Sequence, residues 1–348
     1  MPWRRRSSYN PTSMRSASPE LRLSLRVLAL GLALVASAAC GGADGPVERL
    51  VIPEGASVGA VADTLAAHGI VRWPRLFELY VRLEDADANI KAGTYDLRRG
   101  SGWSQALDAL VAGRVVTVAV TIPEGWTVRR IAQRLAPIAD ISTDSATLRL
   151  LDPALADSLG APGPNLEGYL FPNTYRFAQG VPLEAIAAEL LEHYRAVWTP
   201  ERRAALDSIG MSEREIVTLA SIVQSEARWE DEMPLISAVF HNRLRRRMRL
   251  QADPTVQYAL ESHQRRLLYR HIDSVADHPY NTYTHSGLPP GPIGAPGTAA
   301  IDAALQPAPV PYLYFVARED GRHEFSRSLR EHNQTIQRLR NSSGGTRE

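Results

Sequence analysis

The chain has 348 residues and a formal net charge of +1, from 39 basic and 38 acidic side chains. Domains that bind nucleic acid are usually basic, so this balance argues against nucleic acid as the main partner. The single cysteine, Cys40, excludes an intrachain disulfide and a cysteine-based zinc site, and the single lysine, Lys91, lies outside any Walker A motif.

The charge is unevenly distributed along the chain. Residues 1–40 carry six arginines and one glutamate, a net charge of +5, whereas the remaining 308 residues carry 33 basic and 37 acidic side chains, a net charge of −4. An apolar run of fourteen residues, 27–40, follows the arginines and is short for a bilayer span, which needs about 20 residues. A basic region, a short apolar region and small residues are typical of an export signal. We therefore interpret residues 1–40 as an N-terminal signal or membrane anchor.

Three forms of this anchor are compatible with the sequence. Cleavage after Ala38 would release the protein, lipidation of Cys40 would attach it to a membrane, and an uncleaved segment would serve as a transmembrane helix. Cys40 is followed by two glycines, which favours lipidation, whereas Ser37 stands where a lipidation motif usually has leucine.

One segment of the exported part occurs twice, with an offset of 70 residues. Val51–Val58 (VIPEGASV) recurs as Thr121–Val128 (TIPEGWTV), and the residues that follow are similar as well. Each copy predicts a strand, a Pro-Glu-Gly turn, a Ser or Thr cap and an amphipathic helix. With a returning strand over 93–97, the first copy resembles the LysM carbohydrate-binding module. A structural role of the repeat is the alternative.

The remaining elements predict a mixed α+β fold. Residues 138–165 are rich in Asp, Ser, Pro and Gly and predict an irregular linker. Helices are expected at about 182–198, 212–229, 231–248 and 298–305, a Pro/Gly-rich loop at 277–297, and a strand at 312–317 paired with a strand around Phe325. A polar tail, 341–348, is expected to be disordered.

The predicted helix 212–229 carries an unusual glutamate. Its apolar residues fall on one arc at about 100° per residue, and Glu226 lies within that arc. A glutamate on an apolar stripe is costly unless it is paired or protonated. Burial raises the pKa of such a carboxyl, which can make it a general acid near neutral pH. The alternative is an ion pair between Glu226 and an arginine of the next helix, such as Arg243.

Polar and aromatic groups that suit a glycan follow this helix. Amide, hydroxyl and aromatic side chains can bind sugar hydroxyl and acetamido groups and stack on sugar rings. The candidates for substrate binding are Asn242, Arg243, Gln251, Asp253, Thr255, Tyr280, Asn281, Thr282 and Tyr283. For the Tyr280–Tyr283 stretch, a turn with packed tyrosines is the alternative. The sequence contains no H-E-x-x-H metal motif and no G-x-S-x-G motif.

Together, these blocks resemble the endolytic murein transglycosylase family, which is also called YceG-like. The matching stretches cover most of residues 50–335 and are IPEG, NLEGYLFPNTYRF, LASIVQSEA, AVFHNRL, MRLQADPTV, YNTYTHSGLPPGPI and PYLYFVA followed by GRHEFS. The resemblance implies a LysM-like subdomain, 47–120, and a catalytic domain, 121–340. We expect no cofactor or metal, and the resemblance places the catalytic glutamate in the LASIVQSEA block, where Glu226 is the only carboxylate.

The resemblance also implies a function. The family cleaves the MurNAc–GlcNAc bond within peptidoglycan strands and leaves 1,6-anhydroMurNAc ends, which would terminate strand elongation. We expect an inner-membrane protein whose catalytic domain lies in the periplasm, with glycan strands and peptidoglycan synthases as partners. A muramidase that uses water and a non-catalytic peptidoglycan-binding scaffold are the alternatives.

The chain departs from the family at two positions that bear on the site. Gln224 stands where many members have a glutamate, and Asn173 stands where the family often has aspartate. If residue 224 were the essential acid, this protein would be inactive. Gln224 falls off the apolar arc and Glu226 falls on it, so we expect Glu226 to be the acid.

Overall fold

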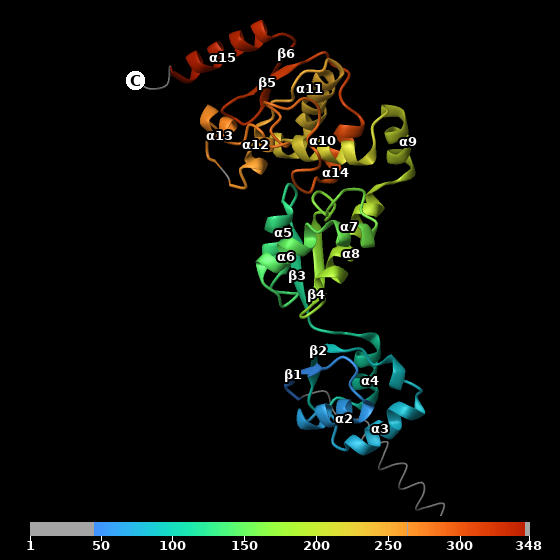
Figure 1. Cartoon of the computed structure of the whole chain (residues 1–348). Helices are drawn as coiled ribbons and strands as arrows, with labels where there is room; N and C mark the ends of the chain where they lie inside the picture. The colour runs from blue at the N-terminus through green and yellow to red at the C-terminus, as the bar shows by residue number, and fades with distance from the viewer. Residues whose placement is uncertain (1–44, 263, 345–348) are drawn as a thin grey trace, which may run out of the picture. The chain divides into compact units, whose positions relative to one another are not determined.

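The structure is a computed structural model that describes residues 45–262 and 264–344. The chain forms two compact units, the first ending at Val116 and the second beginning at Thr117. The break comes four residues before the domain boundary expected from the sequence, so the strand at 117–122 belongs wholly to the second unit. The fold is mixed α+β, as expected, and its three sheets have two strands each within the described residues (Figure 1).

The first unit is a strand–helix–helix–strand–helix arrangement. Its elements are β1 (Val47–Ile52), α2 (Val58–Ala67), α3 (Pro74–Leu83), β2 (Gly93–Arg98) and α4 (Trp103–Ala112), with a 3₁₀ turn at Asp87–Asn89. The antiparallel strands β1 and β2 pair with Leu50 opposite Tyr95. Leu50, Ile52 and Tyr95 alternate with exposed residues and pack on Leu65 and Phe77 of the helices. The alternation arises because successive strand residues face opposite sides of the sheet.

The second unit opens with a similar arrangement that has one more helix before its second strand. Its elements are β3 (Thr117–Ile122), α5 (Val128–Leu135), α6 (Thr143–Leu150), α7 (Pro153–Leu159), β4 (Asn173–Ala178) and α8 (Leu183–Val197). The predicted linker at 138–165 was wrong for much of its length, because α6 and α7 lie there. Ser142 and Asp152 cap these two helices through their side-chain oxygens, so the Asp and Ser residues that suggested a loop mark helix starts instead.

The two copies match well beyond the eight-residue segments that reveal the repeat in the sequence. Val120 of β3 pairs with Tyr175 of β4 as Leu50 pairs with Tyr95 in the first copy. Each tyrosine hydroxyl donates a hydrogen bond of 2.6 Å to the carbonyl four residues earlier. The repeat is therefore a duplication of a whole strand–helix–helix–strand–helix fold, to which the second copy adds the helix α7.

The rest of the second unit is mainly helical. It contains α9 (Pro200–Ile209), α10 (Glu213–Glu226), a 3₁₀ turn at Glu230–Glu232, α11 (Met233–Arg245), α12 (Asp253–Ala259), α13 (Tyr269–Ser274), α14 (Thr298–Leu305), β5 (Tyr314–Ala317), β6 (His323–Ser326) and α15 (Leu329–Gly344). The hairpin predicted around Phe325 is confirmed, since Phe315 pairs with Phe325. Helix α15 extends to Gly344, so the expected disordered tail is wrong for residues 341–344.

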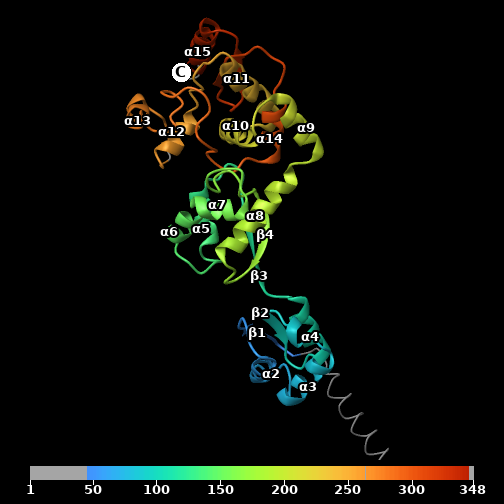
Figure 2. The ribbon, with the colours of Figure 1, turned by 45° about the vertical axis from the view of Figure 1, so that its right-hand side comes forward.

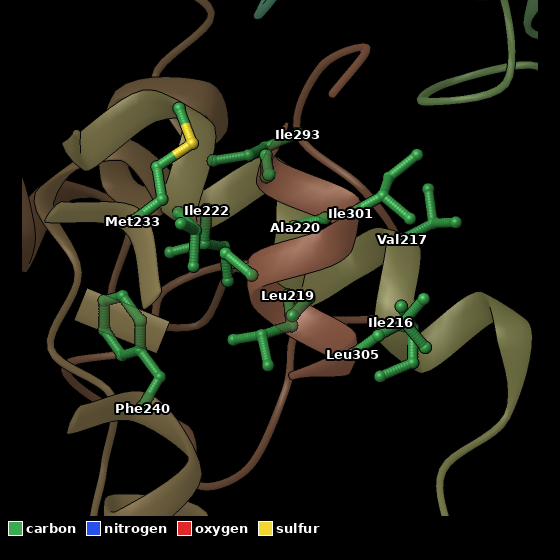
Figure 3. Close-up of a cluster of buried hydrophobic side chains, with 14 of the residues drawn as sticks. Ile216, Val217, Leu219, Ala220, Ile222, Met233, Phe240, Ile293, Ile301 and Leu305 are labelled. Atoms are coloured by element: carbon green, nitrogen blue, oxygen red, sulfur yellow. The ribbon is translucent and has the colours of Figure 1, made fainter. Parts of the chain in front are cut away.

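Helix α10 is the central helix of the second unit's larger core. Apolar side chains of α10 pack against α14 and α11, and Figures 2 and 3 show α10 and α14 side by side. The helix begins with a capping box, in which Ser212 and Glu215 satisfy each other's backbone N–H groups. Ala227 adopts an extended conformation, so α10 ends at Glu226, three residues before the predicted end.

None of the helices among the described residues combines the length and hydropathy that crossing a bilayer requires. The predicted signal or anchor, residues 1–40, lies outside the described residues, as does Cys40 within it.

Candidate active site

A cleft of about 750 Å³ lies within the second unit, at the end of α10. It is bounded by the Pro-Glu-Gly turn and first turns of α5, by the α10 end, and by α12 with the segment that follows it. The acidic and basic residues that line it are Arg129, Arg130, Glu167, Glu226, Asp253, Glu261 and His278, and Gln133, Gln257 and Tyr258 are among the other polar ones. The cleft therefore lies between the second copy of the repeat and the helices that follow it.

Glu226 lines this cleft and is partly exposed to it. Burial raises the pKa of its carboxyl to about 8, the negative charge of Asp253 acts in the same direction, and the guanidinium of Arg243 opposes both. Its place in the last turn of α10 also disfavours the carboxylate, because the C-terminal end of a helix carries a partial negative charge. No other group among residues 45–262 and 264–344 hydrogen-bonds to this carboxyl, so it is available to a ligand.

Arg243 does not form the ion pair with Glu226 that was the alternative interpretation. Its guanidinium is buried, with Nε donating to the Leu313 carbonyl at 2.7 Å and an Nη donating to the Leu250 carbonyl at 2.6 Å. It also stacks on the Tyr314 ring, with Cζ 5.2 Å from the ring centroid. Arg243 therefore connects α11 to the segments at Leu250 and Leu313. It affects the pKa of Glu226 only through its positive charge.

Asp253 is the predicted binding residue that lines the cleft together with Glu226. It is the first residue of α12, directly before Pro254. The Tyr283 hydroxyl donates a hydrogen bond to Asp253 Oδ1, which fixes the carboxylate near Glu226. Burial raises the pKa of Tyr283, and the hydrogen bond to Asp253 acts in the same direction.

The other predicted binding residues do not line the cleft. Four of them are buried with their side chains hydrogen-bonded inside the protein. They are Asn242, which donates to the Val310 and Tyr312 carbonyls, Asn281, which donates to the Ile272 and Val275 carbonyls, and the mutually bonded Thr255 and Thr282. These four are placed to support the site rather than to contact a sugar.

Two predicted residues remain, and they lie near the cleft without lining it. Gln251 is exposed and has a positive φ of 49°, and its backbone N–H donates to the Thr282 carbonyl. Tyr280 packs against Tyr258, with ring centroids 4.8 Å apart, and Tyr258 does line the cleft. The alternative of packed tyrosines therefore describes Tyr280 well.

Sequence reasoning missed Glu167, a second acid in the cleft wall. Its side chain is buried, with Oε1 accepting from the Val128 N–H at 2.9 Å and Oε2 from the Tyr258 hydroxyl at 3.2 Å. Burial raises its pKa to about 7 although these hydrogen bonds favour the charged form. The available signal was its position as the one carboxylate within the apolar, aromatic stretch 165–175, where an acid needs a partner.

Gln224 supports the wall of the cleft. Its Oε1 accepts a hydrogen bond of 2.9 Å from the Gly297 N–H. The neighbouring Pro-Glu-Gly turn is joined to the same loop by two backbone hydrogen bonds, Gly125 N–H to the Ala295 carbonyl and Ala295 N–H to the Trp126 carbonyl. A side chain at Gly294 would lie 2.8 Å from the Gly125 oxygen, so this close approach needs glycine. Gln224 thus acts as an acceptor that holds the loop.

We expect the Gln224→Glu variant to keep activity of the same order as the unmodified protein. A carboxylate oxygen can accept the Gly297 N–H as the amide oxygen does. The measurement is the initial rate of glycan cleavage by the two proteins at neutral pH. A rise of several orders of magnitude in the variant would show instead that residue 224 is the missing acid.

Asn173, the second departure from the family pattern, lies away from the cleft. It is the exposed first residue of β4, and its side-chain oxygen accepts from the Thr174 N–H. The residue type at this position therefore has no direct bearing on the chemistry of Glu226.

The chain is similar to known proteins of one family. The sequence model of the YceG-like family matches residues 50–338. The chain is 32% identical over 298 residues to the endolytic murein transglycosylase of Bacillus subtilis (strain 168), covering 81% of this chain and 82% of that protein. It is 29% identical over 315 residues to the endolytic murein transglycosylase of Streptococcus pneumoniae serotype 2 (strain D39 / NCTC 7466), covering 82% of this chain and 57% of that protein.

A solved structure shares the fold. The crystal structure of a YceG-like protein from Listeria monocytogenes superposes with a TM-score of 0.58 at 32% identity, covering 84% of this chain and all of that one. The family match spans both units and includes the helix that ends at Glu226. This chain therefore belongs to the YceG-like family.

Proposed function

We propose that this protein is an endolytic lytic transglycosylase that cleaves MurNAc–GlcNAc bonds within peptidoglycan strands and leaves 1,6-anhydroMurNAc ends. The observation that carries the proposal is Glu226, an acid with a pKa of about 8 whose carboxyl is free of hydrogen bonds to the described residues and lines the cleft. Two relatives that this chain matches over most of its length carry the name endolytic murein transglycosylase.

One carboxyl is sufficient for this reaction. Protonated Glu226 donates its proton to the glycosidic oxygen as the bond to C1 of MurNAc breaks and the GlcNAc hydroxyl leaves. The resulting carboxylate then accepts the proton of the MurNAc C6 hydroxyl, whose oxygen bonds to C1. No water is consumed, and Glu226 ends the cycle protonated.

The surroundings of Glu226 suit both steps. The negative charge of Asp253 helps keep Glu226 protonated before the reaction and can stabilise positive charge that develops on the sugar ring. The Arg243 guanidinium stabilises the carboxylate that forms after proton transfer. Tyr283, Thr255 and Thr282 act indirectly, because they hold Asp253 and the start of α12.

A muramidase that uses water is the second candidate, and Glu167 is the observation that favours it. Glycosidases that use water generally need two carboxyl groups, and Glu167 is a second acid in the same cleft. Both of its oxygens already accept hydrogen bonds from the protein. That arrangement suits it to joining α5 and α12 better than to activating water.

Product analysis on isolated sacculi tests the proposal. Mass spectrometry of the glycans released by the purified protein should show anhydro ends, which are lighter by one water than the reducing ends of hydrolysis. Reducing ends would identify the muramidase. Binding to sacculi without any new chain ends would identify a non-catalytic scaffold and would overturn the proposal.

We also propose that residues 1–40 direct the protein to the inner membrane, with both described units in the periplasm. Cleavage there would act on nascent strands next to the synthases and would terminate their elongation. The basic N-terminus supports this orientation, since positively charged flanks stay on the cytoplasmic side. The mass of the mature N-terminus distinguishes lipidated Cys40, cleavage after Ala38 and an intact Met1.

A further inference from the structure

The α5 wall of the cleft carries positive charge that the mechanism above does not use. Arg129 and Arg130 line the cleft, and Arg134 follows one turn later on the exposed side of the helix. The opposite side of α5 is buried through Val128, Ile131, Ala132 and Leu135. The arginines are therefore held at the surface of a helix that the core fixes in place.

These arginines differ in their partners. Arg129 forms an ion pair with Glu261 at the edge of the cleft. Neither Arg130 nor Arg134 has a carboxylate partner within the described part of the chain, and both lie over the Trp126 ring, with Cζ 4.8 Å and 5.6 Å from its centroid. Stacking on an aromatic ring limits the conformational freedom of a guanidinium group. It leaves the N–H groups at the edge of the guanidinium free to donate hydrogen bonds to a ligand.

The first copy of the duplicated fold forms without these side chains. At an offset of 70 residues, Trp126, Arg130 and Arg134 correspond to Ala56, Ala60 and Thr64. The two copies otherwise share their strand register, their turn and their helix cap. The tryptophan and the arginines therefore occur only in the copy whose helix lines the catalytic cleft.

The cleft also needs a counter-charge if its ligand is anionic. Asp253, Glu261 and the partly ionised Glu167 would repel negative groups that enter it. Peptidoglycan strands are themselves anionic, because the peptides on MurNAc carry free carboxylates and a nascent strand ends in a lipid-linked diphosphate. Arginine binds both groups through paired N–H donors.

We propose that Arg130, with Arg134 and Trp126, forms a subsite that binds an anionic substituent of the glycan beside the bond that is cleaved. The inference rests on the proposed substrate and goes beyond it, because it makes the enzyme selective for charged, peptide-bearing or lipid-linked strands over neutral glycan. Trp126 supplies the rigid face that orients the two guanidinium groups.

Binding in the Glu226→Gln background tests this subsite without turnover. The ligands are native sacculi and sacculi whose free carboxylates have been converted to carboxamides with a carbodiimide and ammonia. We expect the Glu226→Gln protein to bind native sacculi about tenfold more tightly than the amidated ones. Adding both Arg130→Gln and Arg134→Gln should remove this preference. Adding Arg130→Lys instead, with Arg134 unchanged, should retain only part of it.

Arg176→Gln is the matched control, because Arg176 is an exposed arginine on β4 that does not line the cleft. It should keep the full preference for native sacculi. A third ligand, lipid-linked glycan strands with amidated peptides, separates the two sources of charge. Tight binding of these strands that depends on Arg130 and Arg134 would assign the subsite to the diphosphate, and its absence would assign it to the carboxylates.

Equal binding of native and amidated sacculi by the Glu226→Gln protein, together with binding of the lipid-linked strands that does not depend on Arg130 and Arg134, would overturn the inference. A preference that persists in the double arginine variant would do the same. Failure of the proposed function gives a different result, in which the unmodified protein makes no anhydro ends while the charge preference in binding is still measurable.

Discussion

Replacing Glu226 by glutamine should lower the rate of formation of anhydro-ended glycans by about 10³-fold, because general acid–base catalysis contributes about 10²–10⁴-fold and one carboxyl performs both proton transfers here. Glutamine has nearly the same shape but cannot donate a proton to the glycosidic oxygen or accept one from the C6 hydroxyl. The measurement is the initial rate of product release from sacculi, followed by mass spectrometry.

The control for this variant is Glu230→Gln. Glu230 is an exposed glutamate four residues further on, outside the cleft. It should keep its activity while Glu226→Gln loses it, and binding of both variants to sacculi should be retained. Substantial cleavage by the Glu226→Gln protein would mean that another group, with Glu167 as the first to examine, supplies the proton.

The reaction rate should fall as the pH rises above about 8. The first step requires Glu226 to be protonated, and burial and Asp253 raise its pKa to about 8. Above that pH the protonated fraction decreases by about tenfold per pH unit, so the rate at pH 10 should be about a hundredfold below the rate near neutral pH. An ordinary glutamate, with a pKa near 4.5, would place this falling limb more than three units lower. A rate that is constant up to pH 10 would contradict the role of Glu226 as the acid.

The same pKa predicts how stability depends on pH. In the unfolded chain Glu226 loses its proton near pH 4.5, whereas in the folded protein it keeps the proton to about pH 8. Between these values the folded state binds more protons, so this group makes the protein progressively less stable as the pH rises. The Glu226→Gln variant lacks this decrease in stability, because glutamine does not ionise. Its free energy of unfolding should exceed that of the unmodified protein at pH 9 by about 2 kcal/mol, a figure reduced for the partial exposure of the side chain, and should match it near pH 4.

Denaturation by urea at pH 4, 7 and 9 measures this difference. The Glu230→Gln control should follow the unmodified protein at all three values. A variant that is no more stable at pH 9 than the unmodified protein would show that the folded structure does not disfavour the Glu226 carboxylate.

The strongest local patterns in the sequence predicted elements that the structure contains. The predicted helix 298–305 coincides with α14, and the predicted strand around Phe325 with β6. No strand was predicted at β4, although Tyr175 and Phe177 alternate with exposed residues. The pairing of β4 with β3 spans more than fifty residues. Such a pairing is decided by the packing of both strands on the helices of the same copy rather than by the local residues.

The sequence by itself determined the duplicated strand–turn–helix unit and singled out Glu226, because a repeat and a polar residue on an apolar helix arc are both local patterns. Only the tertiary structure decided which groups surround Glu226. Periodicity shows which side of a helix faces the core, but the partners come from remote segments. Arg243 bonds to the carbonyl of Leu313, seventy residues away, and Glu167 joins α5 to α12. Hydrogen bonds inside the protein make Asn242, Arg243, Asn281 and Thr282 supports of the cleft. Among the described residues, Glu226 is the carboxyl of the cleft that is free of hydrogen bonds and close to Asp253.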